Sequence, residues 1–192
     1  MLKVLIPQEA ISLRIGKLAG EIEQIVPGNM DVLILIKGAF VFGSDLIRSL
    51  SRIRSIHFAR PKSYHGNATT PGSLSWQWPE DLVPQAKTLL IVDDILDSGS
   101  TMKEAGELAR KCGYERVLYA VLLRKVRSSA PKIEAHFVGF EIPDFFVVGY
   151  GLDFNENYRA LPFIGVIEEM NAGNASNPKI THLPANGLGA AI

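Results

Sequence analysis

Three carboxylates stand close together near the middle of the chain, just before a run of small hydroxyl residues. Asp93 and Asp94 follow the apolar segment 88–92, and Asp97 comes three positions later. Helical periodicity begins directly after them, so backbone N–H groups of a first helical turn would point toward an anion. These N–H groups and the neighbouring hydroxyls could together bind a phosphate, so the sequence predicts a phosphate cradle built from Ser98, Gly99, Ser100 and Thr101.

The chemistry of this acidic segment depends on what its carboxylates face. Beside a phosphate cradle they would repel a bare polyanion, so they must face hydroxyls, a divalent cation or a proton that is removed. A sugar phosphate meets all three requirements. We expect Asp93 and Asp94 to accept hydrogen bonds from ribose hydroxyls or to hold a metal-bound water. Asp97 is then the catalytic group near the reacting centre.

A structural interpretation of the same residues stays open. In it, Asp93 and Asp94 cap a turn, and Asp97 or Ser98 is a helix N-cap, which is the commoner use of such residues. Other phosphate-binding motifs do not fit. No Gly-Lys-Ser/Thr of a Walker A loop and no GxGxxG is present, and Ile95 breaks an Asp-x-Asp pattern.

The elements that position this segment alternate between short apolar runs and longer stretches of helical period. This alternation is typical of α/β proteins in which helices cover a parallel sheet. The predicted helices span 8–25, 40–50 and 101–112. The predicted strands span 3–6, 32–37, 55–60, 88–93, 117–123, 135–140, 146–150 and 164–167.

Two stretches fall outside the alternation. Residues 61–84 are rich in polar residues, glycine and proline and contain Trp76 and Trp78, so we expect a long functional excursion with at most a short hairpin. Residues 171–192 are rich in Asn, Ala, Gly and Pro, which predicts a weakly ordered tail.

Composition narrows the class of protein. A hydrophobic fraction of 47% over 192 residues favours one globular domain. Lys+Arg and Asp+Glu number 20 each, so no overall charge draws the chain to nucleic acid or membrane. Apolar runs fall short of the ~20 residues of a membrane span. Cys112 is the single cysteine, and no secretory leader is evident, so we expect a reducing, cytoplasmic location.

Two segments resemble one known family. The run 89–101, LLIVDDILDSGST, resembles the phosphoribosyl-pyrophosphate motif of the type I phosphoribosyltransferases. Residues 137–159, FVGFEIPDFFVVGYGLDFNENYR, resemble the purine-binding hood segment of hypoxanthine-guanine phosphoribosyltransferases. The resemblance spans about 4–168 and implies an α/β, type I phosphoribosyltransferase fold: a central, mainly parallel sheet flanked by helices, with a small hood.

The resemblance also implies roles for residues outside the acidic segment. Phe146 would stack on the purine, and the Val147 backbone would read its polar edge, although by pattern alone the FFVV run is a buried strand. Lys125 would read the oxygen at purine position 6. The pyrophosphate would lie against Lys37, Gly38 and Arg159, its magnesium ion would be held by Asp153, and the lid over 61–79 would begin with Ser63 and Tyr64.

The implied reaction transfers the 5-phosphoribosyl group of phosphoribosyl pyrophosphate to N9 of hypoxanthine or guanine, with Mg²⁺, giving IMP or GMP and pyrophosphate. The implied organisation is a single domain over 1–170 and a homodimer or homotetramer. Asp93 stands where many purine enzymes have Glu, and Phe145 replaces a frequent lysine, which leaves a xanthine-guanine preference open. A non-catalytic regulator of the same fold is the alternative from another class.

Overall fold

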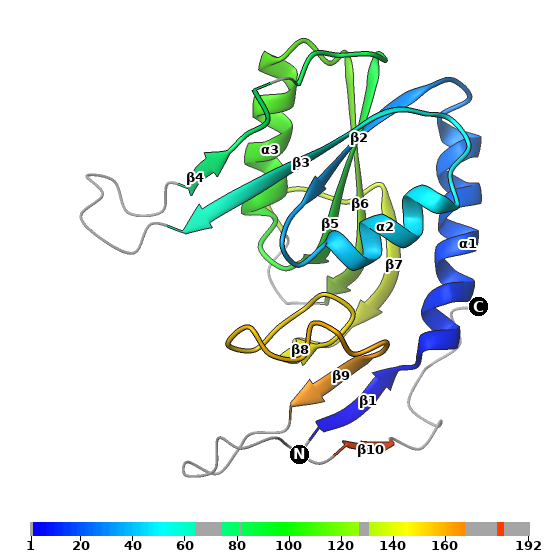
Figure 1. Ribbon diagram of the computed structural model, residues 1–192, viewed down its shortest axis with the longest axis vertical. Helices are drawn as coiled ribbons and strands as arrows, with labels where there is room; N and C mark the ends of the chain where they lie inside the picture. Colours follow the sequence, from blue (N-terminus) through cyan, green and yellow to red (C-terminus); the bar gives the residue numbers. More distant parts are fainter. Residues whose placement is uncertain (1, 64–73, 81, 127–130, 168–179, 183–192) are drawn as a thin grey trace.

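Two β-sheets lie one beyond the other along the long axis of the protein (Figure 1). The structure is a computed structural model that describes residues 2–63, 74–80, 82–126, 131–167 and 180–182. The larger sheet has six strands. Adjacent strands in it run parallel, except that the edge strand β4 is antiparallel to β3. Its order is β4 (Leu74–Gln77), β3 (Ile53–Ser63), β2 (Met30–Leu35), β5 (Thr88–Leu96), β6 (Arg116–Lys125) and β7 (Phe137–Ile142).

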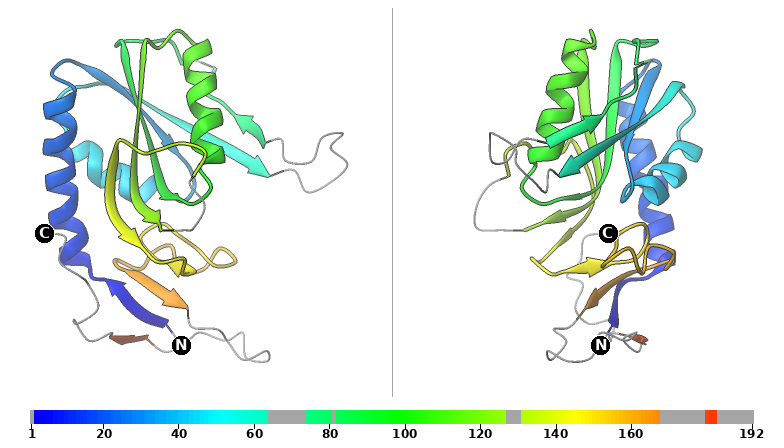
Figure 2. Two further views of the ribbon diagram at one scale, coloured as in Figure 1. Left: turned by 180° about the vertical axis from the view of Figure 1, so that it is seen from behind. Right: turned by 60° about the vertical axis from the view of Figure 1, so that its left-hand side comes forward.

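Helices cover both faces of this sheet. α3 (Ser100–Lys111) lies on one face, and α1 (Gln8–Ile25) and α2 (Phe40–Arg48) lie on the other (Figure 2). The two-residue repeat of a strand divides the buried side chains between the faces, which explains the unbroken apolar runs of β2 and β5. On β2, Val32 and Ile34 face α1 and α2, whereas Leu33 and Leu35 belong to the core beneath α3.

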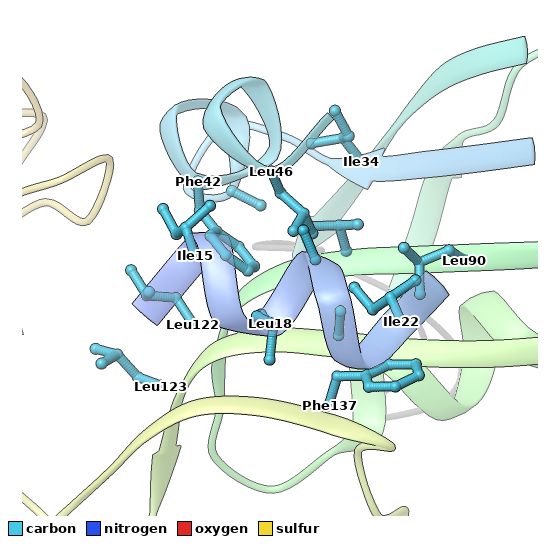
Figure 3. Close-up of a cluster of buried hydrophobic side chains, with 14 of the residues drawn as sticks. Ile15, Leu18, Ile22, Ile34, Phe42, Leu46, Leu90, Leu122, Leu123 and Phe137 are labelled. Atoms are coloured by element: carbon cyan, nitrogen blue, oxygen red, sulfur yellow. The ribbon is translucent and has the colours of Figure 1, made fainter. Parts of the chain in front are cut away.

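The core beneath α1 and α2 is the larger of the two. Apolar residues of α1 recur at helical spacing, so Ile15, Leu18 and Ile22 form one buried stripe (Figure 3). Phe42 and Leu46 of α2 meet this stripe over the middle of the sheet. Together they fix both helices against the strands whose ends form the site.

The smaller sheet, which we call the hood sheet, joins both ends of the chain. Its order is β10 (Ile180–His182), β1 (Leu2–Ile6), β9 (Ile164–Ile167) and β8 (Val147–Val148). β10 lies within the predicted tail 171–192 and pairs in parallel with β1; the rest of that tail is outside the described residues.

The predicted α/β architecture is confirmed. Most predicted helices and strands shift by one to three residues at an end, and two of the differences bear on the site. The helix at 8–25 and the strand at 164–167 have the predicted bounds. β5, however, runs on to Leu96, so Asp93 and Asp94 lie inside the strand and not in a turn. The predicted strand 146–150 is reduced to Val147–Val148, because Gly149 and Gly151 take positive φ and bend the chain.

The long excursion after β3 begins and ends as a hairpin, in agreement with the sequence. β3 and β4 pair from Arg60 with Gln77 to Ser63 with Leu74. Trp76 and Trp78 meet edge to face, with ring centroids 5.7 Å apart, and pack against the core beneath α3. The two tryptophans therefore hold the base of the hairpin to the domain.

Candidate active site

Strand order places the candidate site where the chain reverses direction across the sheet. From β2 the chain moves outward to β3 and β4, and it then returns to β5 on the other side of β2. In open α/β sheets, ligands bind at the carboxyl ends of the two strands flanking such a switch point. Here those ends carry Lys37 and Gly38 after β2, and Asp93, Asp94 and Asp97 at the end of β5.

A cavity of about 280 Å³ opens at this switch point. It brings together eight of the residues predicted from sequence, drawn from the main sheet and from the segment around β8. These residues are Gly38, Asp94, Asp97, Lys125, Phe146, Val147, Asp153 and Arg159, and Ile95 and Leu152 complete the lining.

Several predicted residues do not line this cavity. Lys37 precedes Gly38, and Asp93 precedes Asp94. Ser100 and Thr101 line a second cavity of about 510 Å³ along α3. Ser63 ends β3, and Tyr64 and most of the predicted lid are outside the described residues.

Asp93 and Asp94 are two adjacent carboxylates held inside a strand. Their Oδ1 atoms accept hydrogen bonds from the next backbone N–H groups, Asp94 N at 3.0 Å and Ile95 N at 2.9 Å. Burial raises the pKa of both side chains, and for Asp93 the charge of Asp94 raises it further. A ligand that offers hydroxyls or positive charge would relieve this cost.

Gly38 is in close contact with this acidic pair. A Cβ at position 38 would lie 1.8 Å from Oδ2 of Asp94, so any side chain here would displace this partly buried carboxylate. The absence of a side chain lets the loop after β2 lie directly against β5. The loop backbone and the Asp94 carboxylate therefore share one wall of the cavity.

The predicted phosphate cradle is the first turn of α3. Gly99 caps the helix with φ of 75°, a conformation that glycine adopts without a Cβ clash. Lys103 N donates the helical hydrogen bond to Gly99 O at 3.0 Å, so the N–H groups of Thr101 and Met102 precede it at the open end. Ser98 Oγ lies 3.1 Å from Ser100 Oγ. These groups suit a phosphate.

Lys125 lies between two carboxylates at the end of β6. Its Nζ is 3.0 Å from Oδ1 of Asp144 and 3.7 Å from Oδ2 of Asp97, and its side chain is only 12% exposed. The ammonium group therefore faces the cavity beside the predicted general base. It can donate to an acceptor placed there.

Phe146 offers a flat aromatic face to the same cavity. The side chain is 53% exposed, which argues against core packing at this position. Phe154 contacts it edge to face, with ring centroids 5.6 Å apart, and this contact orients the ring. Val147 is buried in β8, where its pairing with Val166 fixes the backbone.

Arg159 and Lys37 belong to one ion-pair network, joined through Glu156. Nη2 of Arg159 is 2.8 Å from Oδ1 of Asp153 and 3.4 Å from Oε1 of Glu156, and Nζ of Lys37 is 3.0 Å from Oε2 of Glu156. Among the described residues, the buried Nε of Arg159 has no hydrogen-bond partner. A donor is therefore available for an anionic ligand.

Sequence reasoning missed two acidic residues of the site, Asp144 and Glu156. Both stand within the segment that resembles the hood, but their charges gave no signal of which cation each would meet. Lys125 is 19 residues from Asp144, and Lys37 is 119 residues from Glu156. Such pairings depend on tertiary structure, which spacing along the chain does not encode.

An acidic strand end and a hood strand at one cavity, followed by a helix whose first turn could bind phosphate, are the features expected of the type I phosphoribosyltransferase class. Residues 5–155 match the family model described as a phosphoribosyl transferase domain. A hypoxanthine-guanine phosphoribosyltransferase of Aquifex aeolicus is 36% identical over 170 residues, covering 88% of this chain and 96% of that protein. One from Bacillus subtilis is 36% identical, covering 86% and 93%.

Solved structures agree with the sequence relatives. A hypoxanthine-guanine phosphoribosyltransferase of Bacillus anthracis superposes with a TM-score of 0.78 at 33% identity, covering 86% of this chain and 98% of that one. A hypoxanthine phosphoribosyltransferase of Staphylococcus aureus gives 0.77 at 34% identity, covering 86% and 90%. The chain belongs to the hypoxanthine-guanine phosphoribosyltransferase family of purine phosphoribosyltransferases.

Proposed function

We propose that this enzyme transfers the 5-phosphoribosyl group of phosphoribosyl pyrophosphate to N9 of hypoxanthine or guanine, a purine-salvage reaction. One feature carries the most weight. The same cavity places Asp97, Lys125 and Phe146, which suit a purine, next to Asp153 and Arg159, which suit a magnesium pyrophosphate. The products are IMP or GMP and pyrophosphate.

The purine would lie on Phe146 with its polar edge toward β8. Lys125 would donate to the oxygen at position 6, a group that adenine lacks, so this contact favours 6-oxopurines. The backbone of Val147 would read the remaining edge. Adenine carries an amino group at position 6 in place of the carbonyl, so the Lys125 ammonium would face another donor.

Asp97 would remove the proton of N7 as N9 attacks C1 of the ribose. The bond from C1 to N9 forms while the bond from C1 to the pyrophosphate oxygen breaks, and its electron pair leaves with pyrophosphate. Because positive charge develops on the sugar, nearby carboxylates stabilise the transition state. Asp93 and Asp94 would meanwhile hold the ribose hydroxyls.

The two phosphate ends of the substrate would be bound separately. The 5-phosphate fits Ser98, Gly99, Ser100 and Thr101 at the start of α3. The pyrophosphate would lie between the loop of Lys37 and Gly38 and the guanidinium of Arg159. We also expect Ser63 and Tyr64 to begin the lid over 61–79 that shields the reacting sugar from water.

Magnesium fits the donor set of the site. Within the described residues, no three His, Cys, Asp or Glu side chains are grouped to hold a metal ion by themselves. Mg²⁺ commonly takes one or two carboxylates and completes its shell with substrate oxygens and water. Asp153 would supply that carboxylate, and the ion would neutralise charge on the departing pyrophosphate.

A substrate panel tests the reaction and the base together. Purified enzyme, Mg²⁺ and phosphoribosyl pyrophosphate are mixed with hypoxanthine, guanine, xanthine, adenine or uracil, and nucleotide formation is followed by chromatography. We expect hypoxanthine and guanine to give the highest kcat/KM. Fast turnover of xanthine would shift the assignment to xanthine-guanine preference, and no turnover of any base would refute it.

We further propose a homodimer or homotetramer and one catalytic domain over 1–170 with a tail over 171–192. Ile56 and Phe58 of β3, 42% and 51% exposed, pair in register with Val32 and Ile34 and so share the α2 face of the sheet. Sedimentation of the wild type and of Phe58→Glu tests the proposed oligomer, because a monomeric wild type would refute it.

No described helix has the length and apolarity to span a bilayer. Because Cys112 is a free cysteine, we propose a reducing location, the cytoplasm.

A further inference from the structure

The loop from Asp153 to Arg159 has an unusual backbone. Asn155, Glu156 and Tyr158 have φ of 50°, 62° and 75°, in the left-handed region that non-glycine residues seldom occupy. Oδ2 of Asp153 accepts a hydrogen bond from Glu156 N at 2.8 Å and helps to hold this conformation. Strained conformations of this kind persist where the surroundings impose them, and they cluster at functional sites.

The loop presents the carboxylate of Glu156 to two cations at once. Its Oε2 lies 3.0 Å from Nζ of Lys37, and its Oε1 lies 3.4 Å from Nη2 of Arg159. Both contacts lower the pKa of Glu156, so the side chain is ionised at neutral pH. Glu156 is 66% exposed, so the carboxylate can swing away without leaving a buried cavity.

Lys37 and Arg159 are the two cations that the proposed function assigns to pyrophosphate. We infer that the Glu156 carboxylate occupies the pyrophosphate site of the ligand-free enzyme and is displaced when pyrophosphate or its phosphoribosyl ester binds. This inference rests on the proposed function. It deepens that function by assigning Glu156 the control of pyrophosphate affinity and release.

The charges of the cluster explain why both anions cannot stay. Glu156 and Asp153 balance Lys37 and Arg159 in the ligand-free protein. Magnesium pyrophosphate is still a net anion, so with it in place the Glu156 carboxylate would face repulsion and lose both cations. The internal anion therefore weakens binding of the leaving group and speeds its departure after transfer. The substrate gains its remaining affinity from the ribose and the 5-phosphate.

Glu156→Gln removes the charge and keeps the shape of the side chain. Calorimetry with inorganic pyrophosphate and Mg²⁺ should give a Kd about three- to tenfold lower than that of the wild type, because two exposed ion pairs no longer compete. The inhibition constant for pyrophosphate should fall by the same factor, while KM for hypoxanthine stays unchanged. High salt should shrink the difference, because it screens exposed charges.

The matched control is Glu115→Gln. Glu115 is 63% exposed and forms an ion pair of 3.1 Å with Lys87, beside the amino end of the sheet, so its replacement changes net charge equally without touching the site. The Kd for pyrophosphate should then match the wild type. A structural or metal-binding role for Glu156 predicts the opposite shift.

Each outcome of this experiment decides one question. Pyrophosphate binding that is weaker in Glu156→Gln, or equal to that of the wild type, overturns the inference. Failure of the proposed function looks different, because the wild type itself would then form no nucleotide and bind no pyrophosphate. A wild type that forms nucleotide, together with a variant that binds pyrophosphate more tightly, supports both.

Discussion

Acidic residues lie at opposite ends of two neighbouring strands, one fully buried and a pair partly buried, and their surroundings differ. Asp31 is fully buried at the amino end of β2, where its Oδ2 accepts hydrogen bonds from two backbone N–H groups and from the Tyr114 hydroxyl. Asp93 and Asp94 lie near the carboxyl end of β5, and burial raises the pKa of both. Three protein donors thus converge on one oxygen of Asp31, whereas each Oδ1 of the pair accepts a hydrogen bond from the next backbone N–H group.

The difference separates stability from function. A buried carboxylate that accepts several protein hydrogen bonds joins elements, as Asp31 joins β2 to the segment before β5 and to Tyr114, three residues after the end of α3. Carboxylates with raised pKa values beside a cavity are typical of sites that act on ligands. The donors around each carboxylate distinguish the two cases, because three protein groups donate to Asp31 Oδ2, whereas each Oδ1 of the pair accepts one bond from the next backbone N–H group.

The largest expected effect is on turnover, at the cavity end of β5. Asp97→Asn should lower kcat about 10²–10⁴-fold, because general-base catalysis contributes that much, while the melting temperature stays near that of the wild type. Steady-state kinetics and thermal unfolding measure the two quantities. A near-normal kcat would remove Asp97 from the role of base.

The next largest effect is on stability, at the amino end of β2. Asp31→Ala leaves three donors without their acceptor and should lower the free energy of unfolding by about 2–4 kcal/mol. Urea unfolding measures this loss. The kcat/KM of the fraction that remains folded should be unchanged. A loss of activity in the folded fraction would contradict the assignment of Asp31 to stability alone.

A smaller effect should appear in the pH dependence of stability. Because burial raises the pKa of Asp93, the folded state binds more protons than the unfolded state above the ordinary aspartate pKa. The free energy of unfolding therefore falls as pH rises from the ordinary pKa through the raised one. Asp93→Asn removes this fall.

Ligand-free Asp93→Asn should accordingly exceed the wild type in stability at pH 7. The advantage should shrink as pH falls through the ordinary aspartate pKa of 3.8 and vanish below it, where the wild-type carboxyl is protonated in both states. Urea unfolding across this range measures it. Parallel curves for the two proteins would show that Asp93 carries no such cost.

The smallest effect concerns a single hydrogen bond. Tyr114→Phe removes the 3.0 Å bond to Oδ2 of Asp31 and keeps the aromatic packing. We expect a loss of about 1 kcal/mol in unfolding free energy, with kcat and KM unchanged. A loss as large as that of Asp31→Ala would mean that the backbone donors contribute little.

Local pattern predicted most of the fold. Apolar runs and helical stripes located the three helices, the hairpin and the main strands, because side-chain periodicity reflects which face is buried. The continuation of β5 beyond Asp93, through Asp94 to Leu96, was missed, since charged residues indicate a turn. Pairing with Val121 and Leu123 of β6 keeps this segment extended, and that partner is not visible in local sequence.

The structure brings many of the predicted site residues to one cavity, but the ion pairs among them were not predicted. Asp97, Lys125 and Phe146 meet at one cavity as the family resemblance implied. Asp144 and Glu156, which hold Lys125 and Lys37 in the structure, were not predicted, because exposed carboxylates give no sign of a distant partner. The positive φ values around Glu156 were not predicted either, because non-glycine residues seldom adopt them.

A crystal structure with Mg²⁺ and phosphoribosyl pyrophosphate tests the central claim most directly. The account predicts the 5-phosphate at Ser98, Gly99, Ser100 and Thr101, and the ribose hydroxyls within hydrogen-bond distance of Asp93 and Asp94. The pyrophosphate should contact Lys37 and Arg159. A sugar phosphate bound away from the carboxyl end of β5, with Asp93 and Asp94 making no contact to it, would contradict the account.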